Sequence, residues 1–363
     1  MTRTFWAPGR VNLIGEHTDY SDGLVFPAAI DLGITITGAA AERIELQSDF
    51  TEERVDVAAD GSSPAPAGWE RYVAAVASEL DLLGRPAVGF AGAVSSTLPT
   101  GAGLSSSAAL EVAVATALCA VSGFELGALE LAAACRRAEL RAVGVPCGIM
   151  DQAASVLGAA GCAIYLDCGT LEHEAVRLPG DLALVVVDSG VRHEHEHSGY
   201  AERRRELEEA LVVLGGRRPA AVGLAEAQQL AEAGGLDDLH WRRLRHVVTE
   251  NERVRELAAT LRADGPVDRA ELGRIFLEGH RSQRDDYAIS TPELDWLVEL
   301  AYEAGAVAAR MTGGGFGGSM LALVEQGGAH AFGERVSQGY AERFGTEAAV
   351  RICLAADGAG ELL

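Results

Sequence analysis

The stretch PTGAGLSSSAALEVAVATALCAV (residues 99–121) carries most of the information about the fold of this 363-residue sequence. Its glycine-rich start has the composition of a turn, and the apolar residues from Ser105 onward predict a buried helix that ends at Gly123. Gly101 and Gly103 carry no side chain, so a ligand can approach the backbone closely there. Unpaired N–H groups and the positive dipole end at a helix start favour an anion. A flexible loop with a serine helix cap remains the alternative.

Three successive hydroxyls, Ser105–Ser106–Ser107, make phosphate binding the favoured interpretation of this loop. The sequence contains no lysine, so its 30 basic residues are all arginine and the lysine of a P-loop is not available. A phosphate bound here must therefore be held by arginine, by a metal ion or by backbone N–H groups.

Segments around this loop alternate between strand-like and helical patterns, which predicts an α+β protein. Before the loop, strands are expected over 31–38, 42–48 and 86–94, and after it a second helix over 125–142. Further along, the expected elements are a central strand over 182–187, mainly helices from 201 to about 305, strands over 307–311, 320–324 and 349–354, and a helix over 329–343.

The length favours two packed domains. We place the boundary at Pro179–Gly180, between two strand-like runs, which gives domains of residues 1–179 and 180–363. The last segments of the second domain are allowed to pack back on the first.

The composition excludes several classes of partner. Net charge is −23, from 53 acidic against 30 basic residues, which argues against nucleic acid or an anionic membrane. No apolar run is long enough to cross a bilayer, and the start, MTRTFWAPGR, does not resemble a signal peptide. The six cysteines show no C-x-x-C pair and are expected to be reduced thiols. We expect a cytoplasmic protein that is a monomer or a weak dimer.

Two further segments concentrate polar groups. GRVNLIGEHTDY (9–20) contains Arg10, Asn12, Glu16, His17, Asp19 and Tyr20. Acceptors and donors at this density suit a polyhydroxylated ligand, although an exposed loop explains them equally well. In CGIMDQ (147–152), Asp151 lies among apolar and small residues and follows the predicted helix that carries Glu139. Such a carboxylate must be paired or take part in chemistry, unless it bonds to its own helix start.

The segment His193-Glu194-His195-Glu196-His197 matches the H-E-x-x-H zinc pattern. Zinc chemistry needs both histidines on one stable helix plus a third ligand, whereas Gly190 precedes this segment and Ser198–Gly199 follows it. A solvated polar loop is the favoured interpretation.

Together, GRVNLIGEHTDY, PTGAGLSSSAALE (99–111) and MTGGGFGGS (311–319) closely resemble three motifs of the galactokinases of the GHMP kinase superfamily. The first resembles the galactokinase signature, the second the superfamily's ATP loop and the third its C-terminal motif. They stand in the family's order. The intervening pieces VGVPCGIMDQ, VRHxxxxSxYxxRR (191–204) and DDYAISTPELD (285–295) match as well, so the resemblance covers essentially the whole chain.

This resemblance implies the two-domain GHMP kinase fold. An N-terminal ribosomal-protein-S5-domain-2-like domain would be followed by a C-terminal ferredoxin-like α+β domain, with the active site in the cleft between them. The family's catalytic aspartate falls on Asp151 and its partner arginine on Arg10. Sugar contacts fall on Glu16, His17, Asp19 and Tyr200, and the magnesium ligands on Ser107 and Glu139. The ATP phosphates are held by Gly101, Ala102, Gly103, Leu104, Ser105, Ser106 and Ser107.

The implied reaction is phosphorylation of the C1 hydroxyl of α-D-galactose by ATP, with Mg²⁺ as cofactor, to give galactose 1-phosphate and ADP in galactose (Leloir) metabolism. Two alternatives stay open. One is a kinase of the same family for N-acetylgalactosamine, arabinose or a uronic acid; the neutral hydroxymethyl group of galactose suits Glu16 better than a C6 carboxylate does. The other is a non-catalytic sugar and ATP sensor, in which the serine-rich loop tends to be altered.

Overall fold

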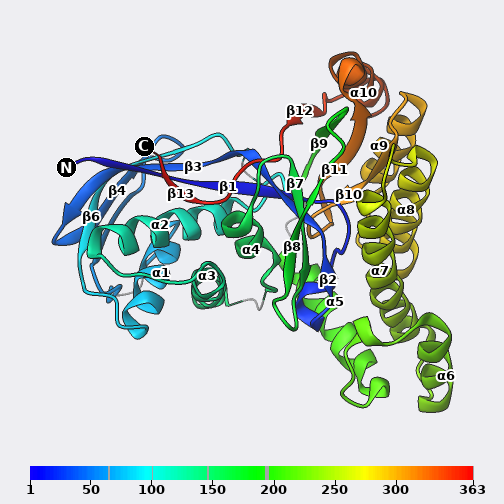
Figure 1. The fold of residues 1–363 in the computed structure, drawn as a ribbon, viewed down its shortest axis with the longest axis horizontal. Helices are drawn as coiled ribbons and strands as arrows, with labels where there is room; N and C mark the ends of the chain where they lie inside the picture. The colour runs from blue at the N-terminus through cyan, green and yellow to red at the C-terminus, as the bar shows by residue number, and fades with distance from the viewer. Residues whose placement is uncertain (64–65, 100, 145–146, 193–195, 363) are drawn as a thin grey trace.

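The computed structural model describes residues 1–63, 66–99, 101–144, 147–192 and 196–362, with the backbone alone described at 196–198. The architecture is α+β, as predicted, with three sheets covered by helices (Figure 1). Among the described residues, no helix combines the length and the apolarity that crossing a bilayer requires. All six cysteines are free thiols, which agrees with the expectation from their spacing.

The largest sheet joins the beginning of the chain to its end. Its strand order is β13-β1-β3-β6-β4-β5. The strands are β1 (Arg3–Asn12), β3 (Pro27–Ala41), β4 (Arg43–Ser48), β5 (Arg54–Ala58), β6 (Gly89–Ser96) and β13 (Gly360–Leu362). Because β13 pairs with β1, the two termini lie at the same end of the molecule (Figure 1). The boundary at Pro179–Gly180 stays a prediction.

Four helices lie on one side of this sheet (Figure 1). They are α1 (Glu70–Leu82), α2 (Ser106–Ser122), α3 (Ala128–Val143) and α4 (Met150–Leu157). Helix α2 packs against β1 and β3 and is apolar on all sides, because α1, α3 and α4 cover its other faces. This burial fixes the start of α2, and therefore the glycine/serine loop, against β1.

A second sheet, with the order β10-β11-β9-β12, forms the other half of the molecule. Its strands are β9 (Leu182–Arg192), β10 (Ala308–Thr312), β11 (Gly317–Glu325) and β12 (Ala349–Cys353). The helices around it are α5 (Glu196–Leu211), α6 (Leu224–Gly234), α7 (Asp238–Arg262), α8 (Arg269–Ser282), α9 (Pro292–Glu303) and α10 (Ala329–Phe344). A small third sheet contains β2 (Leu24–Val25), β7 (Cys162–Asp167) and β8 (His173–Arg177).

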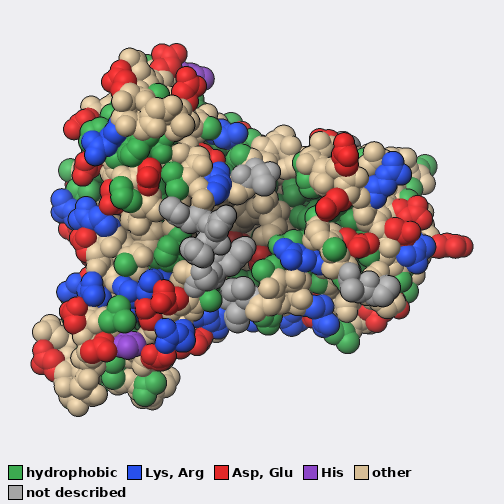
Figure 2. Space-filling model, turned by 180° about the vertical axis from the view of Figure 1, so that it is seen from behind, with side chains coloured by type: hydrophobic (Ala, Val, Ile, Leu, Met, Phe, Trp, Pro, Cys, Tyr) green, Lys and Arg blue, Asp and Glu red, His purple; other side chains and the backbone are tan. Residues whose placement is uncertain are grey.

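The predicted elements are present, with small shifts at their ends; the strand expected over 86–94, for example, begins at Gly89. Figure 2 shows acidic and basic side chains interspersed over one face of the molecule. The exclusion of nucleic acid as a general partner stays a prediction.

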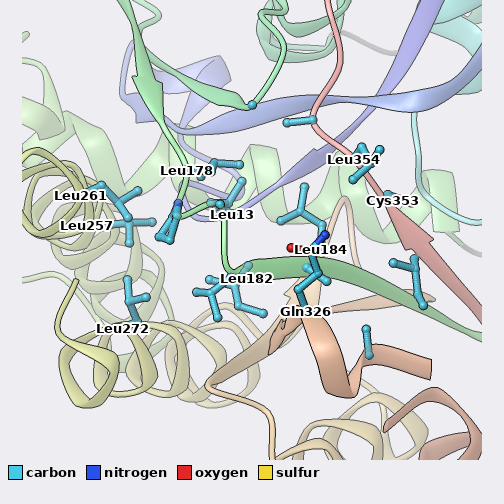
Figure 3. Close-up of a pocket in the computed structure, with 18 of the residues that line it drawn as sticks. Leu13, Leu178, Leu182, Leu184, Leu257, Leu261, Leu272, Gln326, Cys353 and Leu354 are labelled. Atoms are coloured by element: carbon cyan, nitrogen blue, oxygen red, sulfur yellow. The ribbon is translucent and has the colours of Figure 1, made fainter. Parts of the chain in front are cut away.

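An apolar cavity of about 500 Å³ lies between the two halves. Leucines from β9, α7 and α8 point into it, including Leu184, Leu257 and Leu272 (Figure 3). The residues that line it include no carboxylate and no arginine. Its walls are formed largely by aliphatic side chains, with Gln326, His330 and Cys353 among them, whereas the pocket described next brings together several carboxylates and an arginine and is the candidate site.

Candidate active site

A polar pocket of about 220 Å³ lies where the glycine/serine loop meets the N-terminal strand and the glycine-rich segment after β10. It contains every residue predicted to be catalytic, to contact sugar or to bind metal. These residues are Arg10, Glu16, His17, Asp19, Ser107, Glu139, Asp151 and Tyr200. They come from five separate parts of the chain, namely the N-terminal motif and helices α2, α3, α4 and α5, so the fold brings them together.

Asp151 lies in the first turn of α4 and accepts hydrogen bonds from two side chains. Arg10 donates from Nε to Oδ1 and from Nη2 to Oδ2, both at 2.9 Å, and the Ser105 hydroxyl also donates to Oδ2. The carboxylate of Asp151 does not cap its own helix, so the helix-cap alternative was wrong. Arg10 is 5% exposed, whereas the side chain of Asp151 is 29% exposed. The carboxylate is therefore held in place by Arg10 and Ser105 and remains accessible from the pocket.

The glycine/serine loop is anchored on β1. The pairing of β1 with β3 shifts register between Pro8 and Arg10, and the intervening Gly9 lies against the carbonyl of Leu104. Arg10 then donates from its backbone N–H to Leu104 and from Nη1 to the carbonyl of Gly103, at 3.2 and 2.6 Å. A side chain at position 9 would place Cβ 2.6 Å from that Leu104 oxygen, so only glycine permits this approach.

The start of α2 has no side-chain cap. Ser105 occupies the N-cap position with φ +58°, and its hydroxyl donates to Asp151 instead of to the helix. The serine-cap alternative was therefore wrong, and the first N–H groups of α2 remain available for an anion. Ala102 and Leu104 point into the core, so those two residues can serve a ligand only through their backbone. Thr100 lies outside the described residues.

Ser107 and Glu139 form a hydrogen-bonded pair at the wall of the pocket. The Ser107 hydroxyl donates to Glu139 Oε1 at 2.8 Å. The other oxygen, Oε2, accepts from Gln152 Nε2 at 2.7 Å and from the Cys147 thiol at 3.2 Å. Gln152 also donates to Glu111 Oε2 at 3.1 Å. Burial raises the pKa of the Glu111 carboxyl well above its usual value.

Asp19 lies over Gly148. A Cβ added at position 148 would lie 1.8 Å from Asp19 Oδ2, so a glycine is required beside this carboxylate. Burial and the nearby Asp151 raise the pKa of Asp19 to about 6, against the opposing effect of Arg10. The CGIMDQ motif thus supplies both Asp151 and the space that Asp19 occupies.

His17 lines the pocket, but both of its ring nitrogens are engaged. Nε2 donates to the Gly314 carbonyl at 2.9 Å, which leaves Nδ1 to accept from the Tyr20 hydroxyl at 2.8 Å. Tyr20 in turn accepts from Tyr287 at 2.7 Å. Burial lowers the pKa of His17 to about 4, so the ring is neutral. Tyr200, on α5, lies with its ring centroid 5.1 Å from that of His17.

Residues 10–18 are buried, so the exposed-loop alternative for the N-terminal motif was wrong. The glycines after β10 lie beside other backbone: a Cβ at Gly313 would lie 3.1 Å from the Gly103 carbonyl. The Thr312 hydroxyl accepts from the N–H of Asn12 and donates to its carbonyl. This segment therefore joins the two halves at the site.

Several residues at the site were not predicted. Arg310 donates to Glu16, and Glu250 accepts from the N–H of Gly15 directly before it. Gln152 donates to Glu139. Arg192 lies against the glycine/serine loop. A Cβ at Gly101 would lie 2.7 Å from Arg192 Nε. The lack of lysine in the sequence is the signal that points to such arginines.

The zinc motif lies largely outside the described residues, which exclude 193–195 and the side chain of His197. Within the residues that are described, no group of three or more His, Cys, Asp and Glu side chains is arranged to hold a metal.

Three family profiles match the sequence. They are described as the N-terminal domain of GHMP kinases (residues 71–159), the galactokinase galactose-binding signature (residues 2–40) and the C-terminal domain of GHMP kinases (residues 267–342). A galactokinase of Thermococcus kodakarensis is 42% identical over 339 residues, covering 93% of this chain and 94% of that protein. A galactokinase of Roseiflexus is 40% identical over 366 residues, covering 98% and 92%.

The comparison with solved structures also finds a galactokinase. The Lactococcus lactis galactokinase complexed with galactose superposes with a TM-score of 0.93 at 32% identity, covering 99% of this chain and 95% of that one. A mevalonate kinase, with a TM-score of 0.66 and 18% identity, shares the fold alone. With near full-length identity of about 40% to named members, the chain belongs to the galactokinase family of the GHMP kinases.

Proposed function

We propose that this enzyme transfers the γ-phosphoryl group of ATP to the C1 hydroxyl of α-D-galactose. One observation carries the proposal: the Asp151 carboxylate, clamped by Arg10, opens into the same pocket as the start of α2, the Ser107–Glu139 pair, Glu16 and Asp19. Acceptors for sugar hydroxyls therefore lie beside donors for phosphate. Phosphoryl transfer needs mainly such positioning and charge neutralisation.

Asp151 would accept the proton of the C1 hydroxyl as the hydroxyl oxygen attacks the γ-phosphorus and the bond to the ADP oxygen breaks. Arg10 holds both oxygens of this carboxylate and so fixes its orientation. The N–H groups at the start of α2 would hold the phosphates, in a protein without lysine.

Ser107 and Glu139 present hard oxygen ligands 2.8 Å apart at the wall of the pocket, and this donor set fits Mg²⁺. When bound, the ion would supply positive charge to the phosphate oxygens. Phosphates and water commonly complete a magnesium site, so two protein ligands suffice.

Glu16 and Asp19 would accept hydrogen bonds from sugar hydroxyls, with Tyr200 at the edge of the pocket. Because both ring nitrogens of His17 are taken by protein groups, we assign His17 to holding the loop that carries Glu16 and Asp19. Glu16 disfavours a uronic acid, since two carboxylates would meet in a buried site.

A coupled ADP-release assay tests the function with galactose, N-acetylgalactosamine, glucose, arabinose and galacturonate. We expect galactose to give the highest kcat/KM and galacturonate to give no turnover. Turnover with a different sugar alone would overturn the assignment to galactose and keep the kinase. Binding of sugar and ATP without any turnover would favour the sensor.

Gly148→Ala is expected to raise KM for galactose about tenfold while changing kcat little, because the new Cβ displaces the Asp19 carboxylate. The matched control is Gly327→Ala, where an added Cβ meets nothing within 4 Å. Steady-state kinetics with varied galactose measures both. A Gly148→Ala enzyme with the KM of the parent would show that Asp19 does not contact the sugar.

A further inference from the structure

Three charged side chains meet in the interior beside the sugar end of the pocket. Arg310, on β10, donates from Nη2 to Glu16 Oε2 at 2.6 Å and to Glu250 Oε1 at 2.7 Å. All three side chains are at most 1% exposed. Glu16 comes from the N-terminal motif, whereas Arg310 and Glu250 lie about 300 and 230 residues further along the chain.

The charges in this cluster balance. Arg253 donates from Nε to Glu250 Oε2 at 2.8 Å, so two guanidinium groups face two carboxylates. Burial raises the pKa of Glu16 to about 7 although Arg310 opposes the rise, while Arg310 and Arg253 lower the pKa of Glu250 against its burial. Removing one member of such a group leaves an unpaired buried charge. Arg310, which donates to Glu16 Oε2, is therefore the charge that most opposes protonation of Glu16.

The second oxygen of Glu16 has no partner. Oε1 is buried and accepts no hydrogen bond from any described residue, and Glu16 lines the 220 Å³ pocket. Leaving a buried carboxylate oxygen unpaired costs free energy, so a donor is needed there. A sugar hydroxyl bound in the pocket would supply one.

The surroundings of Arg310 determine where its guanidinium lies. Gly279, on α8, leaves the space for it, since a Cβ at position 279 would lie 2.3 Å from Arg310 Nη1. Glu250 Oε1, which holds Arg310, also accepts from the N–H of Gly15 at 2.9 Å, directly before Glu16. One carboxylate thus fixes both the guanidinium and the backbone beside the sugar ligand.

We propose that Arg310 is a positioning residue for the sugar: held by Glu250 and the space at Gly279, it binds one oxygen of Glu16 so that the other faces a sugar hydroxyl. The inference rests on the proposed function, because it assigns to Glu16 a contact with galactose. It adds that sugar selectivity depends on residues of the second half of the chain that do not touch the sugar.

A double-mutant cycle tests this. In the intact enzyme, Glu16→Gln, Arg310→Met and the combination of both are compared by KM for galactose, KM for ATP, kcat and Tm. We expect each single variant to raise KM for galactose about tenfold or more, with KM for ATP nearly unchanged. The KM for galactose of the double variant should be no higher than that of either single variant. Arg310→Lys should lie between the parent and Arg310→Met.

Arg85→Met is the matched control, because Arg85 is 2% exposed, lies away from the pocket and donates only to backbone carbonyls. It should lower Tm without changing KM for galactose. If Arg310→Met does not fold, Gly279→Ala replaces it in the cycle, since that variant keeps every charge.

Two results would overturn the inference. One is a folded Arg310→Met or Gly279→Ala enzyme with the parent's KM for galactose. The other is a double variant in which the free-energy effects of the two substitutions on KM for galactose simply add. If the parent enzyme phosphorylates a different sugar, the proposed function fails separately, and the same cycle run on that sugar decides the role of Arg310. A parent enzyme that phosphorylates no sugar overturns both.

Discussion

Asp151→Asn is expected to lower kcat by about two orders of magnitude or more and to leave KM for galactose nearly unchanged. The carboxamide has the same size and can still accept one hydrogen bond from Arg10, so the pocket keeps its shape. It cannot accept the proton of the sugar hydroxyl. Steady-state ADP release at saturating ATP, with galactose varied, measures both constants.

Asp167→Asn is a suitable control, because Asp167 is also paired with an arginine, Arg218, and is partly exposed, but it does not line the pocket. It should lower Tm slightly and leave kcat unchanged. A kcat like that of the parent in Asp151→Asn would eliminate Asp151 as the proton acceptor.

Asp151→Ala separates proton transfer from orientation. The anomeric hydroxyl is more acidic than an ordinary alcohol, so the alternative to proton transfer is a carboxylate that only orients this hydroxyl. If Asp151 accepts the proton, both variants lose similar activity, since neither can do so. If it only orients the hydroxyl, the carboxamide retains much more activity than alanine, because it still accepts a hydrogen bond.

Residue types singled out two of the polar segments of the candidate site, whereas the roles of Ser107, Glu139 and Tyr200 came from the family resemblance. Asp151 is a carboxylate among apolar and small residues, Glu16 belongs to a short segment dense in polar groups, and the structure places both in one pocket. The prediction did not extend to what each group contacts. Ser105 has the residue type of a helix cap, yet its hydroxyl reaches Asp151, 46 positions away. Such a contact depends on how β1, α2 and α4 pack.

The residues that support the site were missed for the same reason. Arg310 directly precedes the glycine-rich motif, and nothing in its neighbours indicates a partner 294 positions earlier. Glu250 lies within the regular polar and apolar pattern of α7, where a charged residue is expected to be solvated. Only the packing of α7 and β10 against the N-terminal loop buries both.

The fold was easier to predict than its details. Long, strongly patterned elements such as α2 and β9 were identified, because burial on all sides gives a continuous apolar run. Helix α1 was missed although its buried residues Val73, Val76, Ala77 and Leu80 recur at helical spacing. The short strands β5 and β8 alternate too briefly to stand out from loops.

Glu139→Gln is expected to raise the Mg²⁺ concentration for half-maximal activity more than about tenfold and to lower kcat about a hundredfold. The substitution keeps the side-chain size and an oxygen that can accept from Ser107, but it removes the negative charge that favours a divalent cation. Titration of Mg²⁺ at fixed ATP and saturating galactose measures the shift, and Tm reports on folding.

Two controls decide whether the shift comes from metal binding or from the surrounding hydrogen bonds. Glu130→Gln alters a carboxylate at the exposed start of the same helix, where it bonds only to the N–H of Gly127, and should leave the Mg²⁺ titration unchanged. Ser107→Ala removes the other proposed ligand and should shift the titration in the same direction as Glu139→Gln. If Glu139 only holds the network of Gln152 and Cys147, its substitution lowers Tm while the Mg²⁺ titration stays where it is. That outcome would assign Glu139 to structure and leave Ser107 without a partner in metal binding.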